Sequence, residues 1–437
     1  MIEKYLVKKI TEPVDWKVTV PGSKSMTNRA LLMAVLSAGT VRVEGVLFSD
    51  DSRHFLACLV ALGFTVEIEE EKKCVTVTGC GGRIPRGEAV IDVGSAGTAA
   101  RFLAAMLGFS DGCYEIRCSA QMKRRPMAEL FDLLSGAGAK ITFLEEEGHL
   151  PVRITGCRYA RADKTAGELS LDITKSTQFL SALLLIAPMV PEGMKIHITS
   201  EKTDGSYIRI TRRMMQEFGV SVAFDGRDYE VPCRSSYRKE TYMVEPDMSA
   251  ACYFYAAAAV TGGRTLVRHV HMDNTQGDLR FLEVLEHMGC TADDTPEGIL
   301  VTGPADGALR GITVNMNDFS DQALTLAAIA PFADAPVRIE GIGHIRGQEC
   351  DRIHAIQTNL TALGIRCEEE ETAATIYPGS PHGGSVETYD DHRVAMAFSL
   401  VGLRTDGIVI ENPACCRKTF EDYFTVLSEL TGKKTEA

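Results

Sequence analysis

Basic and hydroxylic side chains gather where the first apolar helix of the chain should begin. Residues 21–29 read PGSKSMTNR, and the apolar run ALLMAVL follows directly. A helix start exposes unpaired backbone N–H groups at the positive end of the helix dipole, so Lys24, Ser25 and Arg29 are suited to bind an anion there. A capped helix with solvated basic side chains explains the same residues, and the motif alone does not decide between the two.

Two further motifs in the first half of the chain combine small and basic residues. Residues 94–101 read GSAGTAAR, in which Gly97 lets backbone amides approach a phosphate or carboxylate closely. Its glycine spacing matches neither GxGxxG nor GxxxxGK, which disfavours nucleotide binding. Residues 122–127 read MKRRPM, where Arg125 precedes a proline suited to the first position of a helix. We therefore expect Arg125 to contact a ligand and its neighbours to be solvated.

A third helix start carries neutral hydrogen-bonding groups. Residues 174–179 read TKSTQF and offer Ser176, Thr177 and Gln178 at the start of an apolar helix. An N-cap explains these residues in any case, so a binding role would be an addition.

Polar and charged residues recur at helix starts in the second half. They are Asp321 in NDFSDQALTL, residues 345–352 (IRGQECDR), residues 390–393 (DDHR) and Lys418 in RKTFEDYF. A solvated surface does not predict that these residues fall at the same phase of each structural repeat. The pattern indicates a binding site for small anions.

Composition limits the classes of partner. The net charge of -13 argues against coating nucleic acid or an anionic membrane, because both need a broad basic surface. Residues 1–16 lack the apolar run of a signal peptide and no segment approaches a membrane span, so we expect a cytoplasmic protein. The 13 scattered cysteines have no spacing typical of a disulfide framework or a metal site.

The chain repeats an α/β pattern six times. Each repeat has an apolar helix, a short strand and a second amphipathic helix, and the repeats begin near Thr27, Thr98, Thr177, Ser249, Asp321 and His392. The spacing of about 70 to 80 residues suits a compact α/β unit rather than a solenoid. Because Pro246 disfavours helix at the preceding residue, we place a break there.

This break predicts two domains of three repeats each, residues 21–246 and residues 1–20 plus 247–437. We expect the N-terminal strand to pair with the second half, with a hinge near residues 20–21 and 245–247. Ligands favour clefts between such domains.

Nine motifs in order along nearly the whole chain resemble the 5-enolpyruvylshikimate-3-phosphate synthase family. They are PGSKSMTNRALL, GSAGTAARF, MKRRPM, STQFLSALLL, QGDLRF, SDQALTLA, QECDRI, DDHRVAMAFSLVGL and KTFEDYF. The resemblance implies a two-domain inside-out α/β prism with three repeated units in each domain. It also implies transfer of the enolpyruvyl group of phosphoenolpyruvate to the 5-hydroxyl of shikimate 3-phosphate, without a metal or organic cofactor.

The resemblance assigns roles to individual positions. Phosphoenolpyruvate binding falls to Lys24, Gly97, Arg125, Gln178, Arg352, Arg393 and Lys418. Shikimate 3-phosphate binding falls to Lys24, Ser25, Arg29, Ser176, Thr177, Gln178, Tyr207, Asp321, His344 and Gln348. Catalysis falls to Lys24, Asp321, Glu349 and Lys418, with Glu349 as the acid that protonates the methylene carbon.

Three positions depart from the family pattern. Gln348 stands where a lysine is common, His344 where an asparagine is common, and Asp204 replaces a serine. The loss of a cation at position 348 should weaken substrate binding unless Arg346 or another basic residue compensates.

Two alternatives stay open. One is an enolpyruvyl transferase acting on UDP-N-acetylglucosamine, although Cys118 lacks the flanking glycines of that family's loop. The other is a non-catalytic paralogue that binds phosphorylated metabolites. In either case we expect a monomer whose partners are small molecules.

Overall fold

The chain forms two compact units that are named here for their place in the sequence. A computed structural model describes residues 3–157, 168–174, 176–304 and 308–432. The inner unit is Gly22–Glu245, and the terminal unit combines Met1–Pro21 with Pro246–Ala437. Each unit has its own hydrophobic core.

The inner unit contains three repeats, each with a four-stranded sheet in the part of the chain that the structure describes. The first has α1 (Lys24–Leu36), β3 (Thr40–Glu44), α2 (Asp50–Ala61), β4 (Thr65–Glu69), β5 (Cys74–Thr78) and β14 (Thr241–Met243). The second has β6 (Glu88–Asp92), α3 (Gly97–Gly108), β7 (Cys113–Arg117), α4 (Ala120–Lys123), α5 (Ala128–Gly136), β8 (Lys140–Phe143) and β9 (Val152–Thr155). The third has β10 (Glu168–Leu171), α6 (Thr177–Ile186), β11 (Met194–Ile198), α7 (Ser206–Glu217), β12 (Ala223–Phe224) and β13 (Asp228–Val231).

The terminal unit repeats this plan, except that the sheet of its third repeat has three strands in the described part of the chain. Its first repeat has β2 (Asp15–Val18), α8 (Met248–Thr261), β15 (Arg264–Arg268), α9 (Phe281–His287), β16 (Thr291–Thr295) and β17 (Gly298–Thr302). Its second has β18 (Thr313–Asn315), α10 (Ala323–Ile329), β19 (Val337–Glu340), α11 (Arg352–Ala362), β20 (Cys367–Glu369) and β21 (Ala374–Ile376). Its third has β22 (Gly384–Val386), α12 (His392–Arg404), β23 (Ile408–Glu411), α13 (Tyr423–Leu430) and β1 (Lys4–Leu6).

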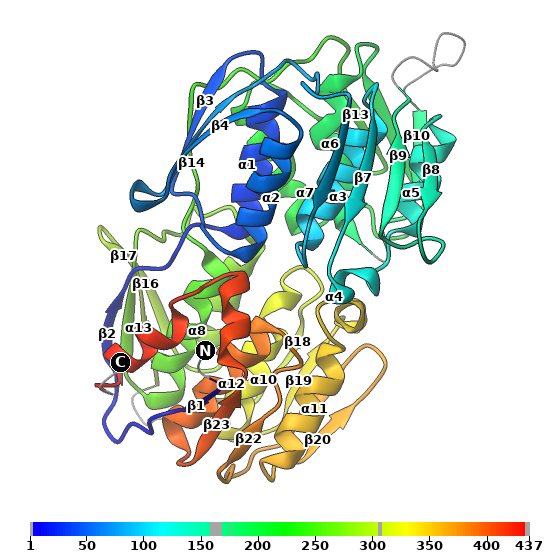
Figure 1. Ribbon diagram of the computed structural model, residues 1–437. Helices are drawn as coiled ribbons and strands as arrows, with labels where there is room; N and C mark the ends of the chain where they lie inside the picture. Colours follow the sequence, from blue (N-terminus) through cyan, green and yellow to red (C-terminus); the bar gives the residue numbers. More distant parts are fainter. Residues whose placement is uncertain (1–2, 158–167, 175, 305–307, 433–437) are drawn as a thin grey trace. The chain divides into compact units, whose positions relative to one another are not determined.

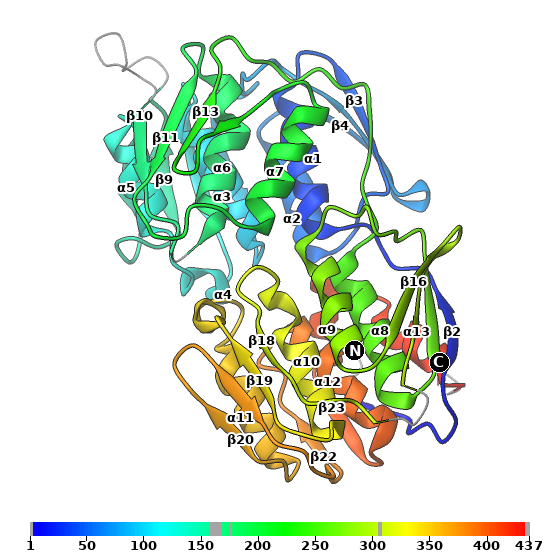
Figure 2. The same ribbon diagram turned by 180° about the vertical axis from the view of Figure 1, so that it is seen from behind.

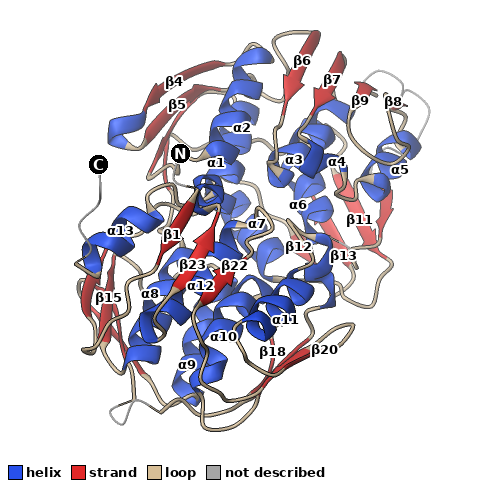
Figure 3. Ribbon diagram, turned by 60° about the horizontal axis from the view of Figure 1, so that its bottom comes forward, coloured by secondary structure: helices blue, strands red, loops and turns tan. Residues whose placement is uncertain are grey.

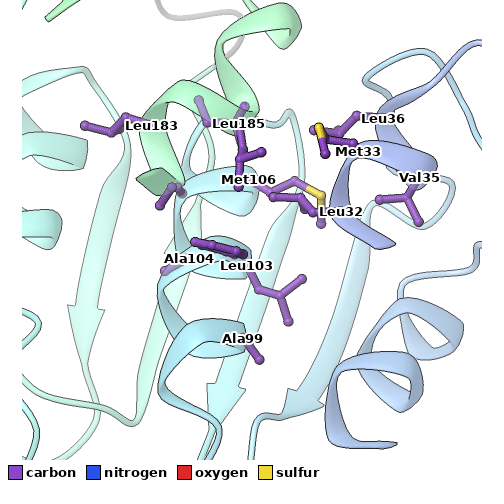
Figure 4. Packing of buried hydrophobic residues seen from close by; sticks show 14 of the residues in the cluster. Leu32, Met33, Val35, Leu36, Ala99, Leu103, Ala104, Met106, Leu183 and Leu185 are labelled. Carbon is purple, nitrogen blue, oxygen red and sulfur yellow. The ribbon is translucent and has the colours of Figure 1, made fainter. Parts of the chain in front are cut away.

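In each unit the first helices of the repeats lie inside, and the strands lie toward the outside (Figure 1, Figure 3). Every residue of α3 is buried, as is nearly every residue of α1 and α12. Beyond their polar starts, which include Arg29, Arg101 and Arg393, these helices are largely apolar on all sides, as expected for helices that other elements surround. In the inner unit, Leu32 and Met33 of α1, Leu103 of α3 and Leu185 of α6 lie in the same cluster (Figure 4). The first helices of the three repeats therefore form the core, and their N-terminal ends carry the predicted site residues.

Strands from distant parts of the sequence complete the sheets (Figure 2). Strand β2 pairs in parallel with β15, and β1 pairs antiparallel with β23. The N-terminal strands thus join the second half of the chain, which is the pairing that the sequence predicts. In the inner unit, β14 pairs in parallel with β3. In both units, a sheet therefore contains strands that lie far apart in the sequence.

Two chemical features accompany the fold. All 13 cysteines are free thiols. Among the described residues, none of the helices has both the length and the apolar character needed to cross a membrane.

Candidate functional site

Arg29 lies in the interior of the inner unit, in the second turn of α1. Only 1% of its surface is exposed. Its Nε donates to Thr211 Oγ1 at 2.8 Å, its Nη1 to the carbonyl of Ser25 at 2.9 Å, and its Nη2 to the carbonyl of Tyr207 at 3.2 Å. The guanidinium also lies over the rings of Phe102 and Tyr207, at 5.3 and 5.7 Å from their centroids. Helices α1, α3 and α7 therefore fix this cation together.

In the part of the chain that the structure describes, Arg29 has hydrogen-bond partners but no counter-charge. Among the described residues, no carboxylate lies within ion-pair distance of its guanidinium. Burial lowers the pKa of Arg29 to about 10, so the side chain is still a cation at neutral pH. A buried charge without an opposite partner is costly, which makes the surroundings of Arg29 favourable for an anion.

Gly97 begins α3 beside two guanidinium groups. A Cβ atom at Gly97 would lie 2.3 Å from Nη1 of Arg125 and 2.7 Å from Nη1 of Arg101. Arg101 donates to the carbonyl of Gly97 at 3.0 Å and to the carbonyl of Pro126 at 3.2 Å. The structure thus brings the predicted residues Gly97 and Arg125 together. It adds Arg101, which the motif GSAGTAAR contains but which the sequence analysis did not select.

The starts of α1 and α6 supply the other predicted residues of the inner unit. Lys24 Nζ lies 3.3 Å from Oδ2 of Asp51, an ion pair that the sequence did not indicate. Ser176 caps α6 by accepting from the backbone N–H of Gln178 at 3.2 Å, and Thr177 is the first residue of that helix. Oε1 of Gln178 is buried without a hydrogen-bond partner among the described residues. One turn further along α6, Ser181 Oγ lies 3.4 Å from Nη2 of Arg29.

In the terminal unit, Arg352 is surrounded by carboxylates. Its Nε donates to Asp391 at 2.8 Å, its Nη1 to Asp321 at 3.0 Å and its Nη2 to Glu349 at 2.9 Å. Nη1 also donates to the side-chain carbonyl of Gln348. Asp391, which the sequence analysis did not select, is fully buried and also caps α12.

Opposing effects act on the pKa of Arg352. Burial is the largest influence and lowers it, but Asp391, Glu349 and Asp321 together raise the pKa above the ordinary value for arginine. The guanidinium is therefore a permanent cation that holds three carboxylates in fixed positions.

Two more cations extend this network. Arg393 Nη2 lies 2.9 Å from Oδ2 of Asp321, and Lys418 Nζ lies 3.2 Å from Oε1 of Glu349. Both cations are at most 9% exposed in their side chains. Asp321 and Glu349 are thus each shared by two cations, with Arg352 common to both.

Two of the three residues that depart from the family pattern, Gln348 and His344, belong to this unit. The third, Asp204, lies in the inner unit, where it pairs with Arg209 at 3.1 Å. His344 Nε2 lies 2.8 Å from Ser320 Oγ, next to Asp321. Arg346 forms ion pairs with Asp351 and Glu369, both at 2.8 Å. These carboxylates hold the guanidinium of Arg346.

The described residues form two clusters of cations, one around Arg29, Arg101 and Arg125 in the inner unit and one around Arg352, Arg393 and Lys418 in the terminal unit. Both clusters are suited to binding phosphates and carboxylates. Each combines buried cations with backbone N–H groups at helix starts, and the cluster in the terminal unit adds two carboxylates that could carry protons. Within the described part of the chain, no group of three or more His, Cys, Asp or Glu is arranged to hold a metal ion.

Comparison with known proteins gives full-length matches. A family model described as EPSP synthase (3-phosphoshikimate 1-carboxyvinyltransferase) matches residues 8–427. A 3-phosphoshikimate 1-carboxyvinyltransferase of Trichormus variabilis is 42% identical over 97% of this chain and 98% of its own length. The protein of the same name from Sulfurovum sp. is 39% identical over 96% of this chain and 97% of its own.

Solved structures agree with these matches. The EPSP synthase of Acinetobacter baumannii superimposes with a TM-score of 0.79 at 25% identity, over 98% of this chain and 97% of that one. The enolpyruvyl transferase NikO of Streptomyces tendae superimposes with a TM-score of 0.73, over 98% of this chain and 97% of that one. At 17% identity the second match bears on the fold alone.

Proposed function

This chain belongs to the EPSP synthase family, and on that premise we propose that it transfers the enolpyruvyl group of phosphoenolpyruvate to the 5-hydroxyl of shikimate 3-phosphate. The chain is thus a transferase of the shikimate pathway, which leads to the aromatic amino acids. The observation that carries the proposal is the network in which Arg352, Arg393 and Lys418 share the carboxylates Asp321 and Glu349.

Phosphoenolpyruvate carries a phosphate and a carboxylate, so it requires several cations. We assign its binding to Lys24, Gly97, Arg125, Gln178, Arg352, Arg393 and Lys418. Charge-assisted hydrogen bonds contribute roughly 1.5 to 3 kcal/mol each, and guanidinium groups add bidentate geometry. The crowding of Arg125 against Gly97 supports this assignment, because a backbone without a side chain lets an anion approach.

Shikimate 3-phosphate carries the same two anionic groups on a hydroxylated ring. We assign its binding to Lys24, Ser25, Arg29, Ser176, Thr177, Gln178, Tyr207, Asp321, His344 and Gln348. The support comes from the charge of Arg29 and from Oε1 of Gln178, both of which are buried and lack a matching partner among the described residues.

The reaction proceeds by addition and elimination. The 5-hydroxyl oxygen bonds to C2 of phosphoenolpyruvate, its proton passes to Asp321, and C3 gains a proton from Glu349. A proton then passes from C3 back to the Glu349 carboxylate as the bond from C2 to the phosphate oxygen breaks, which restores the enol double bond. The leaving phosphate takes the proton from Asp321, so both carboxyl groups return to their starting states. Lys24 and Lys418 stabilise the charge on the leaving phosphate. The reaction balances with these residues alone and needs no cofactor.

The network suggests how substrate prepares the acid. Glu349 is held by Arg352 and Lys418, at 2.9 and 3.2 Å. A phosphate that binds these two cations competes with Glu349 for them. The Glu349 carboxylate is then less strongly held by Arg352 and Lys418 and is able to carry a proton to C3.

The remaining properties follow from size and charge. The chain is acidic overall, and a few of its cations are buried in two clusters, which suits small anionic metabolites rather than nucleic acid. We propose a cytoplasmic monomer.

A phosphate-release assay tests the proposal. The protein is mixed with phosphoenolpyruvate alone, with shikimate 3-phosphate alone, with both together, and with phosphoenolpyruvate plus UDP-N-acetylglucosamine. We expect release with both substrates together and none in the other mixtures. Release in the UDP-N-acetylglucosamine mixture alone would assign the chain to the other class of enolpyruvyl transferase, and binding without release would make it a non-catalytic paralogue.

A further inference from the structure

The motif QGDLRF, residues 276–281, has no role in the function described so far. It contains two buried polar side chains, Gln276 and Asp278, which are 7% and 6% exposed. Gln276 Nε2 donates to the carbonyl of Pro246 at 2.7 Å, and its Oε1 accepts from the backbone N–H of Met248 at 3.2 Å. Gln276 therefore holds the start of α8 in place. This contact gives Gln276 a structural role and leaves Asp278 as the buried polar residue of the motif without one.

Asp278 makes a different set of contacts. It lies in the short helix η3 (Gly277–Arg280), and its Oδ2 accepts from Ser249 Oγ and from Gln322 Nε2, the latter at 2.9 Å. Thr325 Oγ1 donates to Oε1 of Gln322 at 2.9 Å, which fixes the amide with its NH2 group toward Asp278. One carboxylate oxygen thus orders two side chains from two different elements.

Each of those side chains adjoins the reacting cluster. Ser249 Oγ lies 3.5 Å from Nη2 of Arg393. Gln322 follows Asp321 in the short helix η4 (Ser320–Gln322), and Asp321 binds Arg393 at 2.9 Å. Asp278 is therefore linked to Arg393 through the Ser249 hydroxyl. It is linked to Asp321 through the side chain of the next residue, Gln322.

Burying the ionised side chain of Asp278 costs free energy. The pKa of Asp278 is raised to about 6, with burial as the largest cause and the Asp321 carboxylate as the second, while Arg393 and the hydrogen bonds from Ser249 and Gln322 oppose both. The other groups around it are Asp247 and Cys252 of the α8 region, and Cys252 Sγ donates to the backbone carbonyl of Asp278 at 3.6 Å. A neutral residue would be cheaper to bury, so stability does not explain an acid here.

We propose that Asp278 is a positioning residue for the transfer reaction, orienting Arg393 through Ser249 and Asp321 through Gln322. It contacts neither substrate in this scheme. The inference rests on the proposed function, since Arg393 and Asp321 are assigned to substrate there.

The test compares Asp278→Asn with Asp273→Asn. Both changes remove one carboxylate from the same stretch of chain, but Asp273 is exposed and serves as the control. We expect Asp278→Asn to lower kcat by roughly 10- to 100-fold, because small misplacements of catalytic groups have effects of that size. Its unfolding temperature should equal or exceed that of the wild type, since a buried charge is removed. Wild-type kcat, or a loss of activity that only follows a loss of folded protein by circular dichroism, overturns the proposal.

A double-substitution cycle tests the route through Ser249. If Asp278 acts on Arg393 by way of this hydroxyl, Ser249→Ala combined with Asp278→Asn should be no slower than the slower single variant, within about twofold. Losses that multiply overturn this route. A wild-type protein that releases no phosphate contradicts the proposed function instead, so the two failures are distinguishable.

Discussion

A single methyl group at Gly97 should interfere with one substrate and not the other. Because the added carbon would lie 2.3 Å from Nη1 of Arg125, Gly97→Ala must displace that guanidinium. Losing one charge-assisted bond of roughly 1.5 to 3 kcal/mol corresponds to a rise of about 10- to 100-fold in the KM for phosphoenolpyruvate. The KM for shikimate 3-phosphate should change little.

Gly39→Ala is the matched control for steady-state kinetics. No atom lies within 4 Å of a Cβ at Gly39, so this variant should behave as the wild type does. Equal rises in both KM values for Gly97→Ala would contradict a specific role of Arg125.

Glu349→Gln separates proton transfer from binding. The amide keeps the shape of the side chain but cannot donate an acidic proton to C3, and removal of a general acid costs about 10²- to 10⁴-fold in rate. We expect kcat to fall by that factor while calorimetry gives a dissociation constant for shikimate 3-phosphate close to that of the wild type. Normal turnover would remove Glu349 from the mechanism.

At the scale of residues, sequence motifs located the charged groups but not their partners. Lys24 and Arg352 stand out in PGSKSMTNR and QECDRI, whereas their partners Asp51 and Asp391 look like ordinary helix-start aspartates. Which side chains meet depends on helix packing over long sequence separations. The partner of Arg346 could not be predicted for the same reason, because Glu369 comes from strand β20.

At the scale of elements, Asp391 serves both a helix and an ion pair. It accepts from the backbone N–H of Arg393 as the N-cap of α12 and binds Arg352 while fully buried. Asp391→Ala should lower the free energy of unfolding by about 3 to 5 kcal/mol, because it leaves a buried cation short of counter-charge. Urea denaturation measures this change.

Asp351→Ala provides the comparison for that experiment. Asp351 caps α11 in the same way but its side chain is 41% exposed. Loss of this cap and of the half-exposed ion pair with Arg346 should cost about 0.5 to 2 kcal/mol, because an exposed pair contributes little. Equal losses in the two variants would show that the ion pair with Arg352 contributes nothing to stability.

Helix starts were predictable within a few residues. The starts expected at Thr177 and His392 are those of α6 and α12, and α3 begins one residue before Thr98. Asp321 differs, because it lies in the short helix η4 before α10. Apolar periodicity predicts that a helix exists, whereas its first residue depends on local capping that the pattern does not encode.

At the scale of the whole molecule, the two units have separate cores and one of them contains the single tryptophan. Trp16 is 8% exposed in β2 of the terminal unit, so its fluorescence reports the unfolding of that unit. Circular dichroism reports both units. We expect urea transitions followed by the two probes to have different midpoints, and coincident transitions would indicate one cooperative unit.

The six α/β repeats were largely predictable from the sequence. The long-range strand pairing that completes a sheet was not. Six helix starts at regular spacing predicted the α/β repeats, and the full-length likeness to a solved EPSP synthase confirms the fold class. That β14 completes the first sheet of the inner unit by pairing with β3 is a contact over about 200 residues, which local patterns do not reveal.

The central proposal is that Arg125 and Arg393 are phosphoenolpyruvate-binding residues. Titration calorimetry of phosphoenolpyruvate into protein saturated with shikimate 3-phosphate tests it directly, using Arg125→Ala, Arg393→Ala and, as a control, exposed Arg124→Ala. We predict that the first two variants each weaken binding by at least about tenfold and that the control binds as the wild type does. Wild-type affinity in either Arg125→Ala or Arg393→Ala would contradict the account.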